Sequence, residues 1–310
     1  VKDLLGQGGF GAVYLVKDAR VRGNVFALKE VVDPDRKDRD RFIFEAELLK
    51  RLEHRALPRV YRVFNDDKQQ RAYMLMDYVE GQNLEMLRQQ QLGKRFPLSE
   101  VLTLMAPIVD AIAYLHNQNP PVIHRDIKPS NIIAPVTGDD AVLVDFGIAK
   151  EHSPDTTTTA IRRCSPGYAA PEQYGIGTST LTDVYGLGAT FYTLLTGTVP
   201  ADALHRITEL NSTGNDPLIP IQKLAPDVPP HIASIIHRAL SLNSGDRFPT
   251  VDHFWQAMNG SPASQKLAAP KLVPFTPAPL TPANPAGVPP NPVGTRAGAS
   301  LGGTTRAPTL

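Results

Sequence analysis

The stretch from residue 122 to residue 147 constrains this chain more than any other part of it. It brings two acids, an amide and a lysine into one short region between apolar runs: Asp126, Asp145, Asn131 and Lys128. The apolar runs 132–133 and 141–144 flank Thr-Gly-Asp-Asp, which is typical of a turn and predicts a hairpin. Such a hairpin would place Asn131 at the start of one strand and Asp145 at the end of its antiparallel partner, side by side.

The chemistry of this stretch is that of a metal ligand set beside a proton acceptor. Two oxygen-bearing side chains that converge at one end of a hairpin suit Mg²⁺, a hard cation that prefers oxygen ligands and is often shared with substrate phosphates. Asp126 lies on the loop just before the hairpin, where it can accept a proton from a nucleophile. The alternative interpretation is an acidic loop beside a hairpin, with no catalytic role.

The order of these residues resembles that of a known family. His-Arg-Asp-x-Lys-x-x-Asn at 124–131, followed by Asp-Phe-Gly at 145–147, is similar to the catalytic and metal loops of bacterial eukaryotic-like serine/threonine protein kinases. The resemblance implies an α+β fold with two lobes: a small β-rich N-lobe with one regulatory helix, and a large, mainly helical C-lobe. It places the N-lobe at 1–76, the hinge at 77–83 and the C-lobe at 84–260.

The resemblance also assigns roles to the four side chains. Asp126 would orient a substrate hydroxyl and take its proton, and Lys128 would neutralise charge on the transferred phosphate. Asn131 and Asp145 would hold Mg²⁺, or Mn²⁺ in its place. In the family, a lysine two residues after the catalytic aspartate is typical of kinases that phosphorylate serine or threonine. The expected function is transfer of the ATP γ-phosphate to Ser/Thr hydroxyls of protein substrates.

The glycine-rich run near the start of the chain is a candidate phosphate loop. Gly6-Gln7-Gly8-Gly9-Phe10-Gly11 has the G-x-G-x-x-G spacing, which dinucleotide-binding proteins share. Their loop opens a helix, whereas β-prone residues follow here, and residues 22–24 then form a turn signal before 25–29. This order predicts a β-meander in which backbone amides of the glycine loop approach phosphates. A plain hairpin turn is the alternative.

Lys29 closes the apolar strand-like run 25–29 and needs a carboxylate partner if it binds phosphates. Residues 38–53 have the period of a helix, because Phe42 and Leu49 fall on one face. Glu45 lies on that face, where an acid is costly without a partner. We therefore predict a Lys29–Glu45 pair, which matches the family's lysine–glutamate pair, with Lys29 binding the α and β phosphates. A lysine that simply extends from a strand end is the alternative.

By resemblance, the nucleotide lies between the glycine loop and the hinge. Met76 would close the back of the adenine pocket, and backbone groups near Asp77 and Val79 would bind the base. The full set of expected ATP contacts is Gly6, Gln7, Gly8, Gly9, Phe10, Gly11, Val13, Ala27, Lys29, Met76, Asp77, Val79 and Ile133.

Residues 145–172 resemble the family's activation segment, which ends at Ala-Pro-Glu. Thr157 and Thr159 lie in a run of four threonines and are the expected autophosphorylation sites. Arg125 would supply a cation for a phosphothreonine. The sequence departs from the family at Cys164, where glycine is usual. Two structural pairings are also expected by resemblance: Glu172 with Arg247, and Asp183 with the backbone of the catalytic loop.

Composition and net charge limit the partners and the cellular compartment that we expect for this chain. The net charge of +1 gives no general case for binding nucleic acid, and one cysteine fits a reducing compartment. No run of eighteen or more apolar residues occurs, so no membrane segment is expected. Residues 261–310 hold 11 of the 29 prolines and no acid, which is typical of a disordered linker.

The chain opens inside a strand without Met, so we expect a fragment of a longer protein. The resemblance implies a cytoplasmic kinase domain, tethered to a membrane or sensor module beyond residue 310, with a homodimer for trans-autophosphorylation.

Two alternative functions remain for a chain with this sequence. A pseudokinase would bind nucleotide without transfer, although such proteins usually lose the equivalents of Lys29, Asp126 or Asp145. A small-molecule kinase of the aminoglycoside type would share the fold but normally lacks Ala-Pro-Glu and the Lys128 position.

Overall fold

The first part of the chain forms an antiparallel sheet of five strands. The computed structural model describes residues 1–8, 11–18, 23–32, 36–138, 140–146, 164–175 and 177–260. The strands are β1 (Asp3–Gly8), β2 (Gly11–Lys17), β3 (Val25–Val32), β4 (Val60–Asp66) and β5 (Arg71–Asp77), in the order β1-β2-β3-β5-β4. The predicted meander is thus present. Gly11 is required where β2 begins, because a Cβ there would lie 1.8 Å from the carbonyl oxygen of Glu30 on β3.

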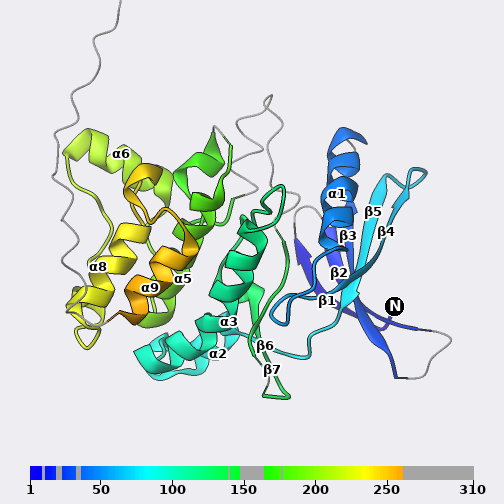
Figure 1. Ribbon diagram of the computed structural model, residues 1–310, viewed down its shortest axis with the longest axis horizontal. Helices are drawn as coiled ribbons and strands as arrows, with labels where there is room; N and C mark the ends of the chain where they lie inside the picture. Colours follow the sequence, from blue (N-terminus) through cyan, green and yellow to red (C-terminus); the bar gives the residue numbers. More distant parts are fainter. Residues whose placement is uncertain are drawn as a thin grey trace, which may run out of the picture. The chain divides into compact units, whose positions relative to one another are not determined.

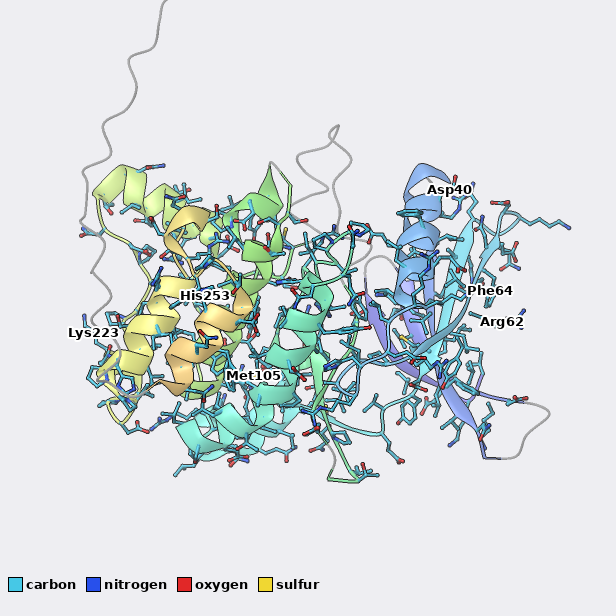
Figure 2. All side chains as sticks on the ribbon, viewed as in Figure 1. Asp40, Arg62, Phe64, Met105, Lys223 and His253 are labelled. Carbon is cyan, nitrogen blue, oxygen red and sulfur yellow. The ribbon has the colours of Figure 1, made fainter. Side chains whose placement is uncertain are left out.

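One face of this sheet packs on helix α1 (Arg36–Leu49), which Figure 1 shows beside the strands. Ala72, Met74 and Met76 alternate along β5 as its buried residues, as expected for a strand with one covered face. Phe64 of β4, labelled in Figure 2, is 45% exposed. Helix α1 ends four residues before the predicted limit of 53. Leu52 is still buried, because the chain continues inward through a tighter turn in which its N–H donates to the carbonyl of Leu49.

A second, three-stranded sheet holds the predicted hairpin. Its strands are β6 (Gly81–Asn83), β7 (Ile132–Pro135) and β8 (Val142–Leu143), all antiparallel. Ile132 pairs with Leu143, and the N–H of Val144 donates to the carbonyl of Asn131 at 2.8 Å. The hairpin prediction is confirmed, and it brings Asn131 and Asp145 to one end of the pair.

The C-lobe is built around α5. Its α-helices are α2 (Leu84–Gln90), α3 (Leu98–His116), α5 (Thr180–Thr196), α6 (Ala203–Thr213), α7 (Ile221–Leu224), α8 (Pro230–Ala239) and α9 (Val251–Asn259). Short 3-10 helices are η1 (Leu92–Lys94), η2 (Pro129–Asn131), η4 (Pro171–Tyr174) and η5 (Ser244–Asp246). Residues 182–196 of α5 are all buried, with α3, α8 and α9 packed against it (Figure 1). The expected two-lobed α+β fold is confirmed.

Helix α3 is the described helix whose length and apolar composition would allow it to cross a membrane. It lies in the core: Met105, labelled in Figure 2, and Ile112 are fully buried. The buried core helix of a water-soluble domain passes the same test.

Several predictions fall outside the described residues. They concern Gly9, Phe10, Thr157, Thr159 and the proline-rich segment 261–310.

Candidate active site

The loop that carries Asp126 is fixed to α5 through Asp183. The Asp183 carboxylate accepts from the backbone N–H groups of His124 and Arg125, each at 2.8 Å, and lies 2.9 Å from His116 Nε2. Burial would raise the pKa of this carboxyl, but the hydrogen bond and charge of His116 lower it below its ordinary value. Asp183 therefore stays ionised and holds the loop backbone from inside the lobe, as predicted.

Two residues of the site have left-handed backbone conformations. The φ angles are +67° at Arg125 and +63° at Asp145, and neither residue is glycine. A non-glycine residue in this region costs about 1–3 kcal/mol and persists only where the surroundings impose it. Both residues stand beside or within the predicted catalytic and metal motifs, so this strain marks the two turns as functional candidates.

Asp126 is surrounded by three side chains that hold its carboxylate in one orientation. Its Oδ1 accepts from Ser165 Oγ at 2.7 Å, and its Oδ2 lies 3.0 Å from both Lys128 Nζ and Asn131 Nδ2. Lys128 also donates to Ser165 Oγ at 2.8 Å. The carboxylate is therefore oriented, and it lies where a hydroxyl of a bound substrate could replace the hydroxyl of Ser165.

Asn131 and Asp145 fit a hard divalent cation. Both amide hydrogens of Asn131 are directed to Asp126, one to the backbone oxygen at 2.8 Å and one to Oδ2, so its Oδ1 is the atom presented on the other side. Burial would raise the pKa of Asp145, but the Lys29 ammonium lowers it below its ordinary value. Among the described residues no group of three or more His, Cys, Asp or Glu is arranged to hold a metal ion by itself. Two protein oxygens suffice for Mg²⁺, which keeps waters and substrate phosphates as further ligands.

The predicted ion pair between Lys29 and Glu45 is wrong for this structure. Lys29 Nζ contacts Asp145 Oδ1 instead and donates to the backbone oxygen of Phe146 at 3.2 Å. Glu45 accepts from Arg125 Nη1 at 3.3 and 3.5 Å. The prediction that Glu45 lies on a covered face and needs a cation holds. Its partner differs because a second cation, Arg125, approaches from the C-lobe, which helix periodicity cannot reveal.

A pocket of about 350 Å³ lies beside Asn131 and Asp145. Seven predicted nucleotide contacts and both predicted metal ligands line it: Gly6, Val13, Ala27, Met76, Asp77, Val79, Ile133, Asn131 and Asp145. Lys29 reaches it through its contact with Asp145. Gln7 and Gly8 are the last two residues of β1, where Gly8 pairs with Gly11 of β2.

Eight further residues that were not predicted from the sequence line the pocket: Leu5, Pro58, Tyr78, Gly81, Asn83, Met86, Ser130 and Val144. Val144 could have been found, because it lies beside Asp145 in the predicted hairpin. Pro58 and Met86 could not, since they come from segments whose approach depends on the folded arrangement. Gly81 has no space for a side chain, because a Cβ would lie 2.2 Å from the carbonyl oxygen of Ala134.

The end of the predicted activation segment is held by a buried ion pair. Arg247, whose side chain has no exposed area, donates to Glu172 at 2.7 and 2.9 Å. It also donates to the backbone oxygen of Leu181, and Thr182 Oγ1 donates to Glu172. The predicted Glu172–Arg247 pair is confirmed. Cys164 has its Sγ 3.7 Å from the backbone oxygen of Gln173.

We expect the free energy of unfolding to fall in acid, in part through Glu172. Burial raises the pKa of the Glu172 carboxyl, but the hydrogen bonds and charge of Arg247 lower it by more. The folded-state pKa therefore lies below the ordinary value. A carboxyl with a depressed pKa contributes stability that is present above its unfolded-state pKa, about 4.3, and is lost as pH falls through the folded-state pKa. Urea denaturation at a series of pH values checks this. The slope of stability against pH below about pH 4.5 should be smaller in Glu172→Gln, and equal slopes would contradict the assignment.

The sequence was compared with models of known protein families. The family model described as "Protein kinase domain" matches residues 1–258. This chain belongs to the protein kinase family. The catalytic loop, the hairpin and the glycine-rich strands described above therefore lie in a protein kinase domain.

Similar proteins include bacterial kinases. Serine/threonine-protein kinase B of Synechocystis sp. is 34% identical over 217 residues, covering 64% of this chain and 37% of that protein. Serine/threonine-protein kinase C of the same organism is 30% identical, covering 84% and 49%. Among solved structures, the apo form of PpkA-294 has a TM-score of 0.68 at 28% identity, covering 83% and 94%. The Mycobacterium tuberculosis PknI kinase domain has a TM-score of 0.64 at 28% identity, covering 83% of this chain and 93% of that one. This protein kinase chain thus spans less than half the length of these two curated relatives.

Proposed function

We propose that this protein transfers the γ-phosphate of ATP to serine or threonine hydroxyls of protein substrates. The observation that carries the proposal is the placement of Asp126, whose carboxylate is held by Lys128 and Asn131 and already accepts a hydrogen bond from a hydroxyl, that of Ser165. Phosphoryl transfer asks mainly for positioning and charge stabilisation, and this arrangement offers both beside a pocket of nucleotide size.

Each side chain has a proposed role in the reaction. Asp126 orients the acceptor hydroxyl and takes its proton, while Lys128 neutralises charge on the transferred phosphate. Asn131 Oδ1 and Asp145 hold Mg²⁺, with Mn²⁺ as an alternative, and the metal when bound would neutralise charge on the nucleotide phosphates. The pocket residues Ala27 and Met76 give the base its apolar surroundings.

The observed ion pairs support a proposal on regulation. Glu45 is paired with Arg125, the residue expected to bind a phosphothreonine. Phosphate on Thr157 or Thr159 would compete with Glu45 for this guanidinium and would release Glu45 to Lys29. We propose that autophosphorylation of these threonines, in trans within a homodimer, activates the enzyme.

The placement of the lobes and the surroundings of the domain are further proposals. The proposed bounds are an N-lobe at 1–76, a hinge at 77–83, a C-lobe at 84–260 and a linker at 261–310. In support, β1–β4 and α1 fall within 1–76, and β5 runs one residue past it, to Asp77. The kinase domain acts in the cytoplasm, and the linker leads to a membrane or sensor module. The length of the curated relatives supports additional parts.

Replacing Lys29 by methionine is expected to lower the transfer rate more than nucleotide affinity. The change removes the cation at Asp145 and the proposed contact with the α and β phosphates, so the nucleotide can still enter the pocket but is held less productively. Initial rates at several ATP concentrations separate the two effects. Lys50→Met is the matched control, because Lys50 is an exposed lysine that pairs with Glu47. An unchanged maximal rate in Lys29→Met would contradict the proposal.

Intact-mass measurement and peptide mapping after incubation with ATP and Mg²⁺ test the proposed function. Phosphate on Thr157 or Thr159 in the wild type and none in Asp126→Asn is the expected result. If a generic protein substrate and the chain itself both stay unmodified while thermal shift shows nucleotide binding, the pseudokinase alternative is favoured. Phosphorylation of small alcohols without phosphorylation of protein would favour the small-molecule kinase.

A further inference from the structure

The catalytic loop makes a tight backbone turn directly before Asp126, and three polar side chains hold this turn. Arg125 has a φ of +67°, a costly conformation that persists only where the surroundings impose it. The N–H groups of His124 and Arg125 donate to Asp183, and the N–H of Asp126 donates to His124 Nδ1 at 3.4 Å. The carbonyl oxygen of Arg125 accepts from Gln173 Nε2 at 2.9 Å. The peptide group between Arg125 and Asp126 is therefore held at its oxygen by Gln173.

The side-chain amide of Gln173 joins one donor to one acceptor. Its Oε1 accepts from the backbone N–H of Ala170 at 2.9 Å, while its Nε2 donates to the Arg125 carbonyl. A backbone N–H can only donate and a carbonyl can only accept, so these partners fix which end of the amide is oxygen. Gln173 is 6% exposed, and a buried polar group that loses its partner is costly. A carboxylate in its place could accept from Ala170 but could not donate to Arg125.

The short helix that carries Gln173 is itself fixed to the C-lobe. Gln173 lies in η4, directly after Glu172, which accepts from the buried Arg247 at 2.7 and 2.9 Å. Thr182 Oγ1 donates to the same carboxylate at 3.0 Å. Because its backbone is anchored in this way, the amide of Gln173 presents its donor to the catalytic loop from a defined position.

The segment 164–174 meets Asp126 and its backbone at two points. Ser165 Oγ donates to the Asp126 carboxylate at 2.7 Å, and in the proposed reaction a substrate hydroxyl takes the place of this hydroxyl. Gln173 instead holds the backbone beside Asp126, where no substrate group has to enter. The Gln173 contact can therefore remain in place while the acceptor is bound, whereas the Ser165 contact cannot.

We propose that Gln173 is a positioning residue for phosphate transfer. It fixes the peptide group before Asp126 and thereby the direction in which the carboxylate meets the acceptor hydroxyl. This inference rests on the proposed role of Asp126 as proton acceptor. A displacement of about 1 Å in a reacting group can lower a rate about 10²-fold. Gln173 is not among the residues that line the nucleotide pocket, so its effect should fall on transfer and not on ATP affinity.

Two substitutions of Gln173 test this role. Gln173→Met keeps the length of the side chain but removes both hydrogen bonds. Gln173→Glu keeps an acceptor for Ala170 but has no donor for the Arg125 carbonyl while the introduced carboxyl is ionised, as it should be at about pH 8.5. Single-turnover rates at saturating ATP should fall about 10- to 100-fold in both variants. The KM for ATP should stay within about twofold of the wild type.

Gln118→Met is the matched control. Gln118 makes the same kind of bond at the end of α3, where its Nε2 donates to the backbone oxygen of Tyr114 at 2.9 Å. Its substitution removes a glutamine bond to a carbonyl close to the catalytic loop without touching the turn before Asp126. Casein and myelin basic protein serve as acceptors, and the transfer rate of Gln118→Met should equal that of the wild type.

Hydrogen exchange followed by mass spectrometry measures the hold on the loop without any transfer of phosphate. Peptides that cover residues 124–131 should exchange about tenfold faster in Gln173→Met than in the wild type. Peptides of α5 should exchange as in the wild type. If the wild type transfers no phosphate, the proposed function fails, and the exchange rates still decide whether Gln173 holds the loop.

The inference is overturned if both variants of Gln173 keep the wild-type transfer rate. It is also overturned if Gln173→Met loses activity while Gln173→Glu does not, since the bond to Ala170 would then be the one that matters. Equal exchange of residues 124–131 in Gln173→Met and the wild type would exclude a hold on the loop. Faster exchange throughout the C-lobe, together with a raised KM for ATP, would show a general structural role instead.

Discussion

Replacing Asp126 by asparagine is expected to lower phosphate transfer by about 10²–10⁴-fold while nucleotide binding stays close to that of the wild type. The amide has the shape of the carboxylate, so Ser165 and Lys128 can keep neighbouring positions, but it cannot take a proton. The nucleotide pocket should be unaffected, because Asp126 is not among the residues that line it. Initial rates with a protein substrate and calorimetric titration of the nucleotide measure the two quantities.

The control for this variant is Asp140→Asn. Asp140 lies in the hairpin turn, is exposed, and pairs with Arg55 at 2.9 Å, so the same chemical change there should leave transfer unaltered. A transfer rate of Asp126→Asn within a few-fold of the wild type would contradict the role of Asp126 as proton acceptor. Loss of nucleotide binding together with transfer would show that the substitution acts through folding or pocket shape.

Replacing Arg247 by methionine is expected to lower the free energy of unfolding by about 3–5 kcal/mol. Methionine fills much of the volume but removes the cation, so Glu172 is left as a carboxylate that is largely shielded from water and without its charge partner. The backbone oxygens of Leu181 and Ser241 lose a donor at the same time. Urea denaturation followed by circular dichroism gives the change in stability.

Arg95→Met is the matched control for this effect. Arg95 pairs with Asp227, but it is 30% exposed and its partner is 61% exposed. Pairs of this kind contribute about 0–1 kcal/mol, because water screens them and both side chains lose freedom. A loss below about 1 kcal/mol in Arg247→Met would mean that Glu172 finds another partner or becomes protonated.

The site contains two carboxylates and two cations that can form ion pairs in two ways, and the structure shows one of them. Two carboxylates, Glu45 and Asp145, and two cations, Lys29 and Arg125, are paired as Lys29–Asp145 and Arg125–Glu45. The alternative pairing, Lys29 with Glu45, needs a new anion at Arg125 and a cation at Asp145. The proposed phosphothreonine would meet the first need, and the proposed divalent metal would meet the second.

Much of the site follows from sequence because its residues are close in the chain. Asp126, Lys128 and Asn131 lie on one loop, and Asp145 follows from a hairpin whose turn is visible in the sequence. In an antiparallel hairpin the start of the first strand lies beside the end of the second, so the predicted turn was enough to bring Asn131 and Asp145 together. The glycine-rich strands and the burial of α5 could be predicted for similar local reasons.

The sequence by itself determined which side chains carry the chemistry and the order of the elements that hold them, since both depend on spacing and period along the chain. Only the tertiary structure decided the partners of Lys29 and Glu45 and the approach of Pro58 and Met86 to the pocket. These depend on which of several oppositely charged or apolar groups comes closest in space. Coulomb energies and packing are set by distance and burial, and neither can be read from sequence separation.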